Sequence, residues 1–160
     1  MGDETTVRVD QPRGHTPGKQ GGGVPNYWIV KTEPSTYSFD DLARQKAAVW
    51  DGVKNSLALK HLREMKPGDR VLVYHTGDEK AVVGVAEVVS EAYPDPKRKD
   101  PKLVVVDLKA GERLPHPVPL AEIKKERAFA DLGLVRIGRL SVMPASADQF
   151  KRLLELGGRK

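Results

Sequence analysis

The sequence predicts an α+β domain: a small open β-barrel of about five to six mostly antiparallel strands, with short helices at its periphery. Two observations lead to this prediction. Runs of β-branched and aromatic residues are separated by short turns that contain proline and glycine. Between these runs lie short segments in which apolar residues recur at helical spacing. The chain has 160 residues, enough for one such domain around one core.

The two ends of the chain are expected to lie outside this domain. Residues 1–25 are rich in glycine and proline and poor in apolar side chains, so we expect a disordered N-terminal tail. The folded domain is expected over residues 26–157, followed by a short C-terminal tail at 158–160. Positive and negative charges balance within the N-terminal tail, so the net charge of +5 belongs to the folded part. This mild basic excess is compatible with nucleic-acid binding, but many soluble proteins share it.

The first half of the domain alternates strand and helix patterns. Residues 27–33 are aromatic and β-branched, and they predict a strand that ends at Pro34, which lacks an N–H group. Ser38 is a typical N-cap for a short helix with an acidic first turn. A loop over residues 50–55 then leads to a second helix, which is capped by Asn55 or Ser56 and extends to about Lys66.

The second half consists mainly of strand patterns joined by turns. Gly84 lies within one of these patterns and is expected to mark a β-bulge or the close approach of another group. The expected elements are a strand at 70–75, a hairpin loop at 76–80, a return strand at 81–89, a loop at 93–101, a strand at 103–108, a proline-punctuated connection at 111–119, a helix at 120–127, a short strand near 140–142, and a last helix that begins at Ser146 or Ala147.

Several functional classes lack their sequence signals. Cysteine is absent, which excludes disulfides, thiolate zinc sites and cysteine nucleophiles. The four histidines follow no metal-ligand spacing, so we expect no metal and no cofactor. No apolar run approaches the roughly 20 residues that span a bilayer, and no apolar segment marks a secretory signal, so we expect an intracellular, cytoplasmic protein. Catalytic motifs such as a nucleophile elbow or a Walker loop are also absent.

The sequence does place polar residues beside aromatic ones at several predicted strand ends. Single-stranded or flipped nucleotides are held by this combination of stacking, base-edge hydrogen bonds and a basic surround. The candidate ring surfaces are Trp28, Trp50, Tyr74 and His75; the candidate base-edge contacts are Thr32, Asp51, Asn55, His75 and Ser141; and the candidate phosphate contacts are Lys31, Lys54, Arg136 and Arg139.

A structural interpretation of the same residues stays open. Trp50 is equally typical of a core residue, and Asn55 of a helix N-cap. Glu33 at a strand end is either a general base or a carboxylate held by a backbone N–H group or a lysine. His75 either contacts a ligand or is a hydrogen-bonded structural histidine.

Several stretches, in order along the chain, resemble the motifs of one family. They are Tyr-Trp-Ile-Val-Lys-Thr-Glu-Pro-Ser-Thr-Tyr-Ser-Phe-Asp at 27–40, Trp-Asp-Gly-Val-Lys-Asn at 50–55, Tyr74-His75, Gly-Val-Ala-Glu-Val at 84–88, Leu-Val-Arg at 134–136 and Arg-Leu-Ser-Val-Met-Pro at 139–144. Together they resemble the EVE domain family. The resemblance implies a PUA-like fold and a non-catalytic domain that binds nucleic acid carrying a modified base, either DNA or RNA. We expect the protein to be a monomer.

The resemblance also implies which residues form the ligand site. Carried over position by position, they are Trp28, Lys31, Thr32, Glu33, Trp50, Asp51, Val53, Asn55, Tyr74, His75 and Ser141, with phosphate contacts from Lys54, Arg136 and Arg139. The chain departs from the family pattern at Lys54, where arginine is common, and at residues 56–59, where Ser-Leu-Ala-Leu replaces a stretch with an aromatic residue and an arginine. Thr32, Thr76 and Met143 are further departures.

Two other functions stay open. The first is an enzyme that acts on nucleotides or modified nucleosides, with Glu33 or His75 as acid or base. The second is a structural or protein-binding module in which Trp28 and Trp50 both belong to the core.

Overall fold

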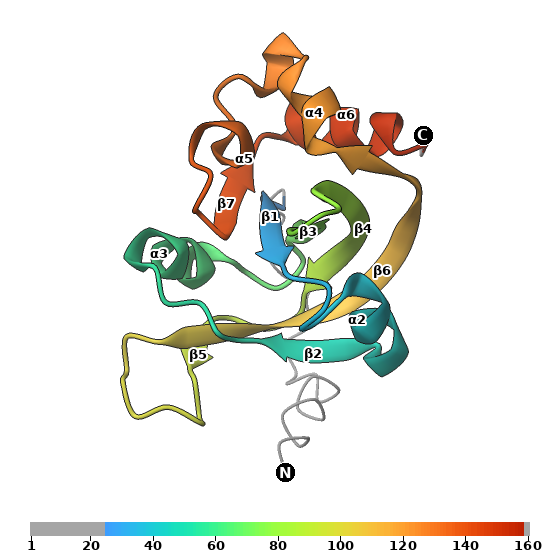
Figure 1. Ribbon diagram of the computed structural model, residues 1–160. Helices are drawn as coiled ribbons and strands as arrows, with labels where there is room; N and C mark the ends of the chain where they lie inside the picture. Colours follow the sequence, from blue (N-terminus) through green and yellow to red (C-terminus); the bar gives the residue numbers. More distant parts are fainter. Residues whose placement is uncertain (1–24, 159–160) are drawn as a thin grey trace.

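The structure, a computed structural model, describes residues 25–158 (Figure 1). Almost all of the predicted N-terminal tail, and the last two residues, lie outside the described residues. The elements, in chain order, are β1 (Tyr27–Thr32), α2 (Phe39–Gln45), β2 (Ala47–Trp50), α3 (Ser56–Glu64), β3 (Arg70–His75), β4 (Ala81–Val88), β5 (Tyr93–Pro94), β6 (Val104–Pro119), α4 (Leu120–Lys124), the 3-10 helix η2 (Arg127–Phe129), α5 (Gly133–Arg136), β7 (Val142–Ala145) and α6 (Ala147–Leu156).

The strands form one mixed sheet, which confirms the predicted α+β class. Within the described residues it has seven strands in the order β2-β6-β4-β3-β1-β7, with β5 paired to β6, and it does not close into a barrel. Only β1 and β3 pair in parallel, whereas every other described pair is antiparallel. The parallel pair is possible because the long connection α2–β2–α3 returns the chain to the starting end of the sheet.

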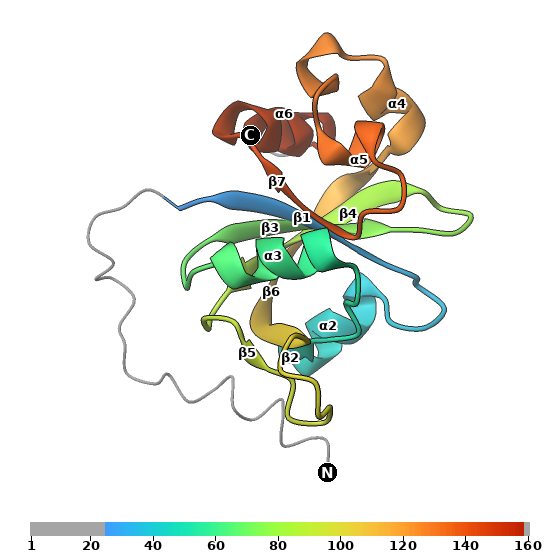
Figure 2. The ribbon, with the colours of Figure 1, turned by 90° about the vertical axis from the view of Figure 1, so that its left-hand side faces the viewer.

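Helices cover both faces of the central strands. In Figure 2, the layer formed by β1, β3 and β4 has α4, α5 and α6 on one side and α2 and α3, with β2 and β5, on the other. This double cover explains why the central strands are apolar on both faces: Ile29, Val30 and residues 71–73 are all fully buried. None of the described helices has the length and apolar character needed to cross a membrane.

The prediction for residues 111–119 is wrong, because β6 continues through them. Pro115, Pro117 and Pro119 are spaced by two, so their missing N–H groups fall on one side of the strand and leave donors on the other. His116 uses its N–H to bond Gly157 O at 2.9 Å, and β6 pairs with β4 as far as Pro119. Figure 1 shows the result: β6 bends along the whole molecule, from β5 and β2 at one end to α4 at the other.

Other boundaries also differ from the prediction. Trp50 ends a strand rather than lying in a loop, since β2 pairs with β6 through Trp50 and Val106. The short elements β5 and α5 were not predicted, and α3 ends at Glu64. The helix starts are as predicted: Ser38, Asn55 and Ser146 each accept backbone N–H groups as N-caps.

Gly84 confirms both predictions made for it. The register of β4 shifts on both sides of Gly84 where it pairs with β6. A Cβ atom at this position would lie 2.5 Å from the Phe39 ring, so only glycine lets that ring pack against the sheet. Gly84 thereby positions the first residue of α2, which matters for the site described next.

Candidate functional site

The ends of β1 and β3 bring five of the predicted site residues together. Lys31 is paired with Tyr74, and Thr32 with His75, in the parallel register. The backbone N–H of Lys31 donates to Ser141 O at 2.9 Å, which adds the residue just before β7. We call these five residues the strand-end cluster. Sequence positions far apart thus meet at one edge, because parallel strands end on the same side.

Lys31 is held between the cluster and the segment before β7. Its Nζ donates to Gly138 O at 2.8 Å and lies 5.7 Å from the centre of the Tyr74 ring. Burial lowers the pKa of the Lys31 ammonium and raises the pKa of the Tyr74 hydroxyl. Arg136 and Arg139 flank Gly138 and are exposed, so three predicted phosphate contacts lie close along this edge.

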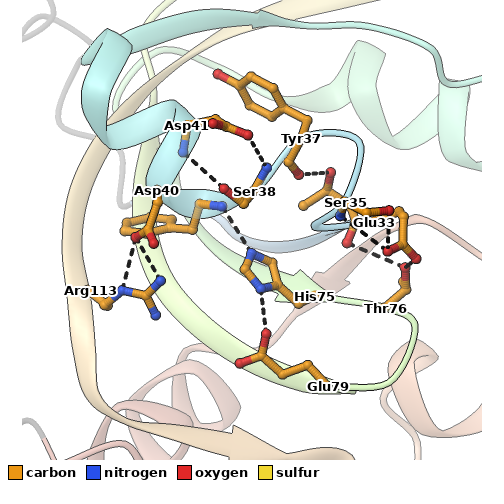
Figure 3. Close-up of polar contacts among 12 residues, drawn as sticks. Glu33, Ser35, Tyr37, Ser38, Asp40, Asp41, His75, Thr76, Glu79 and Arg113 are labelled. Carbon is orange, nitrogen blue, oxygen red and sulfur yellow. Dashed lines mark hydrogen bonds and ion pairs between the residues drawn. The ribbon is translucent and has the colours of Figure 1, made fainter.

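Glu33 follows β1 and is fixed by hydroxyl and backbone donors (Figure 3). Its carboxylate accepts from Ser35 N at 3.3 Å, from Ser35 Oγ at 3.0 Å and from Thr76 Oγ1 at 3.3 Å. These bonds, led by that from the Ser35 backbone, hold the pKa of Glu33 below its ordinary value. Glu33 is therefore an exposed, ionised carboxylate, whereas a general base needs a raised pKa.

His75 is buried, and both of its ring nitrogens have partners (Figure 3). Phe39 N donates to His75 Nε2 at 3.0 Å, so this nitrogen carries no proton. The other nitrogen, Nδ1, lies 2.8 Å from Glu79 Oε1, so it carries the proton and donates to that carboxylate. His75 therefore joins the start of α2 to the β3–β4 hairpin, as the structural interpretation expects, and neither nitrogen is free for a ligand.

Tyr37 connects the strand-end cluster to the segment at 50–55. It is not among the site residues that the sequence predicts. Its backbone oxygen accepts from Thr32 Oγ1 at 2.6 Å. Its ring meets the Trp50 ring edge to face, with the ring centres 6.0 Å apart, and its hydroxyl donates to Gln45 Oε1. Burial raises the pKa of Tyr37 to about 12. The sequence could have identified Tyr37 as a site residue, because it lies within the family motif at 27–40.

The segment at 50–55 has a buried and an exposed part. Trp50 is 7% exposed and Val53 9%, so both side chains belong to the edge of the core. Asp51, Lys54 and Asn55 are exposed. Gly52 between them has φ +82, a backbone conformation that favours glycine.

The oxygen and the nitrogen of the Asn55 side-chain amide differ in their hydrogen bonding. Its Oδ1 accepts from Leu57 N at 2.9 Å and from Ala58 N at 3.0 Å, which caps α3. Its Nδ2 has no hydrogen-bond partner among residues 25–158. The same side chain therefore holds the helix and offers a free donor to solvent.

Trp28 is not brought to this edge. It lies three residues before Lys31 on β1, about 10 Å along the strand, and is 3% exposed. Its Nε1 donates to Asp69 Oδ2 at 2.9 Å. Asp69 is itself buried and also accepts from the backbone N–H groups of Asn26 and Lys66. Trp28 thus belongs to the network that joins the starts of β1 and β3.

Comparison with protein families assigns this architecture. The model of the EVE domain matches residues 26–156. The chain belongs to the EVE domain family. The resemblance inferred from the sequence motifs is thereby confirmed, and the match covers almost all of the described residues.

Relatives of this EVE domain include thymocyte nuclear protein 1 of Mus musculus, which is 31% identical over 173 residues, covering 86% of this chain and 76% of that protein. Among solved structures, a protein of Rhodopseudomonas palustris is 42% identical with a TM-score of 0.79, covering 83% of this chain and 93% of that chain. Human THYN1, solved in complex with DNA that contains 5-methylcytosine, is 28% identical with a TM-score of 0.77, covering 85% of this chain and 99% of that chain.

A more distant structure shares the fold alone. ASCH from Zymomonas mobilis has a TM-score of 0.54 at 11% identity. Together with the nearer relatives it supports the predicted PUA-like fold class. Among the described residues of this EVE domain, no group of three or more histidine, aspartate or glutamate side chains is arranged to hold a metal ion.

Proposed function

We propose that this EVE domain binds DNA and recognises a modified base in it, with 5-methylcytosine as the first candidate. The observation that carries the proposal is the match to human THYN1, which was solved with DNA containing that base and which superposes along nearly its whole length. The half-buried Lys31 and Thr32 at the end of β1, together with the exposed polar side chains at 51–55, supply the chemistry that such recognition needs.

Within this proposal the candidate residues take different roles. Asp51 and the free amide donor of Asn55 contact the base edge, together with Thr32 and Ser141. The small exposed parts of Trp50 and Tyr74 contact the base ring. Lys31, Lys54, Arg136 and Arg139 contact phosphates. Glu33, Val53 and His75 shape the site through their contacts, and Trp28 acts on it only through the fold.

The geometry favours binding over acid–base catalysis by the two residues considered for it. Glu33 has a lowered pKa, and His75 has both nitrogens occupied by protein partners. An enzyme that uses these two groups would need a raised pKa at Glu33 or a ring nitrogen of His75 without a protein partner. Their observed contacts instead hold the turn at 33–38 against the end of β3.

The proposal is tested by titrating the full chain with matched duplexes that differ at one cytosine: unmodified, 5-methyl or 5-hydroxymethyl. We expect one modified duplex to bind more tightly than the unmodified one. A single-stranded RNA with the same base change serves as a further arm. Equal affinity for every modified ligand and its unmodified control would contradict base recognition.

Asn55→Ser probes the site without loss of the helix cap. Serine retains an oxygen that caps α3 but lacks the amide donor, so the fold should persist. We expect the preference for the modified duplex to fall roughly tenfold, as for the loss of one base-edge hydrogen bond. Ser56→Ala, at the next and also exposed position, is the control and should keep the preference.

A further inference from the structure

A basic loop lies apart from the candidate site and takes no role in it. Residues 95–103 read Asp-Pro-Lys-Arg-Lys-Asp-Pro-Lys-Leu and connect β5 to β6. The side chains of Lys97, Arg98, Lys99 and Lys102 are all exposed. None of these four cations forms an ion pair with another residue between 25 and 158. The loop carries these four cations and two carboxylates, so it keeps a net positive charge, which attracts an anionic partner.

The loop is built from two successive turns of the same kind. In the first, Asp95 Oδ1 accepts from Lys97 N at 2.9 Å, and Asp95 O accepts from Arg98 N at 3.1 Å. In the second, Asp100 Oδ1 accepts from Lys102 N at 2.9 Å, and Asp100 O accepts from Leu103 N at 3.0 Å. Proline follows the aspartate in both, as type I turns favour. The two carboxylates therefore bond to the loop's own backbone.

Further contacts fix the loop to the rest of the domain. Asp95 N donates to Leu103 O at 2.8 Å, which closes the base of the loop. Arg63 of α3 donates to Lys102 O at 3.2 Å and is itself exposed. A loop held in this way loses little conformational entropy when it binds, so its cations are presented ready for contact.

Helix α3 sets the distance between this loop and the candidate site. The helix begins at the cap Asn55 and reaches Arg63, which touches the loop. Eight residues of α-helix span about 12 Å. Successive phosphates of one DNA strand are about 3.4 Å apart along the axis, so this span corresponds to roughly three to four base pairs. Figure 1 shows the loop below α3, at the opposite end of the molecule from α4 and α6.

We propose that the loop at 95–103, with Arg63 of α3, binds the phosphate backbone of DNA three to four base pairs from the recognised base. The inference deepens the proposed function and rests on it. The contact carries no sequence information; it adds affinity and fixes the direction in which the duplex leaves the site.

The test compares two variants with equal loss of charge. The loop variant is Lys97→Gln with Arg98→Gln and Lys99→Gln, which leaves both Asp-Pro pairs in place. The control is Lys124→Gln with Arg127→Gln and Lys151→Gln, three exposed cations on α4, η2 and α6 at the other end of the molecule. Each is titrated with the modified and the unmodified duplex over a series of salt concentrations.

We expect the loop variant to bind both duplexes roughly tenfold more weakly and to keep its preference for the modified base. Its slope of log affinity against log salt should fall by about 2 to 3, since each lost phosphate contact removes about 0.9. The control variant should bind like the unaltered chain.

Four results would overturn one or both of the proposals. Unchanged affinity and salt slope in the loop variant would overturn the loop contact and would point to an acidic protein as its partner. A loss as large in the control variant would overturn it too, because only net charge would then matter. Equal binding of both duplexes, weakened by the loop substitutions, would refute base recognition alone, whereas no binding of either duplex would refute both proposals.

Discussion

Asn55 caps α3 with its side-chain oxygen, and in the proposed function its amide nitrogen contacts the base. Substitutions can separate these two roles. The sequence suggested both a helix cap and a base-edge contact for this residue. The structure shows that the cap exists and that it does not use the nitrogen, so the two interpretations are compatible.

At this residue we predict a difference between two small substitutions. Asn55→Ala removes the oxygen that accepts two N–H groups of α3, so the free energy of unfolding should fall by about 1 kcal/mol. Asn55→Ser should lie within a few tenths of a kcal/mol of the unaltered chain, because serine caps as well. Urea denaturation measures both. Equal losses in the two variants would contradict the capping role.

Glu33 should make thermal stability depend on pH. Its pKa in the folded chain is lower than the ordinary value of 4.5, so folding favours the ionised carboxylate. The resulting stabilisation is present above pH 4.5 and is lost as the pH falls below it, through the lowered pKa. Glu33→Gln should therefore have a lower Tm than the unaltered chain at neutral pH, and the two Tm values should converge in acid.

The control for this pH effect is Glu91→Gln. Glu91 is also exposed, but its carboxylate accepts no hydrogen bond and forms no ion pair among residues 25–158, and only its backbone oxygen is bonded, by Ser90 Oγ. A constant Tm difference between Glu33→Gln and the unaltered chain, from neutral to acid pH, would show that the carboxylate contacts do not stabilise the fold.

At the scale of elements, α2 is fixed to the sheet by contacts around its first turn. The Phe39 ring packs against Gly84 of β4, and Phe39 N bonds His75 of β3. Asp40 accepts from Arg113 of β6 at 2.7 Å, and the Arg113 guanidinium also lies over the Phe39 ring. Three strands therefore determine where the turn at 33–38, and with it Tyr37, lies.

We predict that Gly84→Ala disturbs this attachment. The new Cβ would lie 2.5 Å from the Phe39 ring, so the ring and the start of α2 must shift. We expect a loss of about 1–3 kcal/mol in unfolding free energy, as for other overpacked sites. Gly138→Ala is the control, because a Cβ there meets nothing within 4 Å and φ is not positive. Similar losses at both positions would contradict the steric explanation.

Local signals in the sequence predicted the elements that depend on local chemistry. Ser38, Asn55 and Ser146 identified three helix starts, because N-caps satisfy backbone groups of the next turn. The same signals wrongly predict a connection at residues 111–119, because proline is typical of a break in a strand. The spacing of these prolines by two is harmless in a strand that needs donors on one side only, but which side that is depends on the partner strand.

At the scale of the whole molecule, the meeting of residues from β1, β3 and the segment before β7 was predicted only through the family motifs. Composition and periodicity contain no information on the parallel register that pairs Lys31 with Tyr74. Burial was equally hard to predict: Trp28 and Trp50 are similar in sequence terms, yet one bonds Asp69 in the core and the other contacts Tyr37 beside the site.

We predict a sharp N-terminal limit of the stable domain. A chain that begins at Pro25 should keep its Tm, since the family match begins at residue 26. A chain that begins at Tyr27 loses two hydrogen bonds made by the backbone of Asn26. Asn26 N donates to Asp69 Oδ1 at 3.0 Å, and Asn26 O accepts from Arg70 N at 3.1 Å. Its Tm should fall by several degrees, as for the loss of about 1–2 kcal/mol. Scanning calorimetry of both chains measures this, and equal Tm values would contradict it.

The place of β1 in the sheet has a consequence for the order of folding. Its two neighbours, β3 and β7, come from the middle and from near the end of the chain. Contacts between distant positions must overcome loop-closure entropy first, so they form late. During synthesis, a chain that has emerged only as far as β6 has Lys31, Thr32 and Tyr74 but lacks the partner strand that completes their arrangement. If the proposed function holds, such a nascent chain should be unable to bind DNA until β7 has left the ribosome.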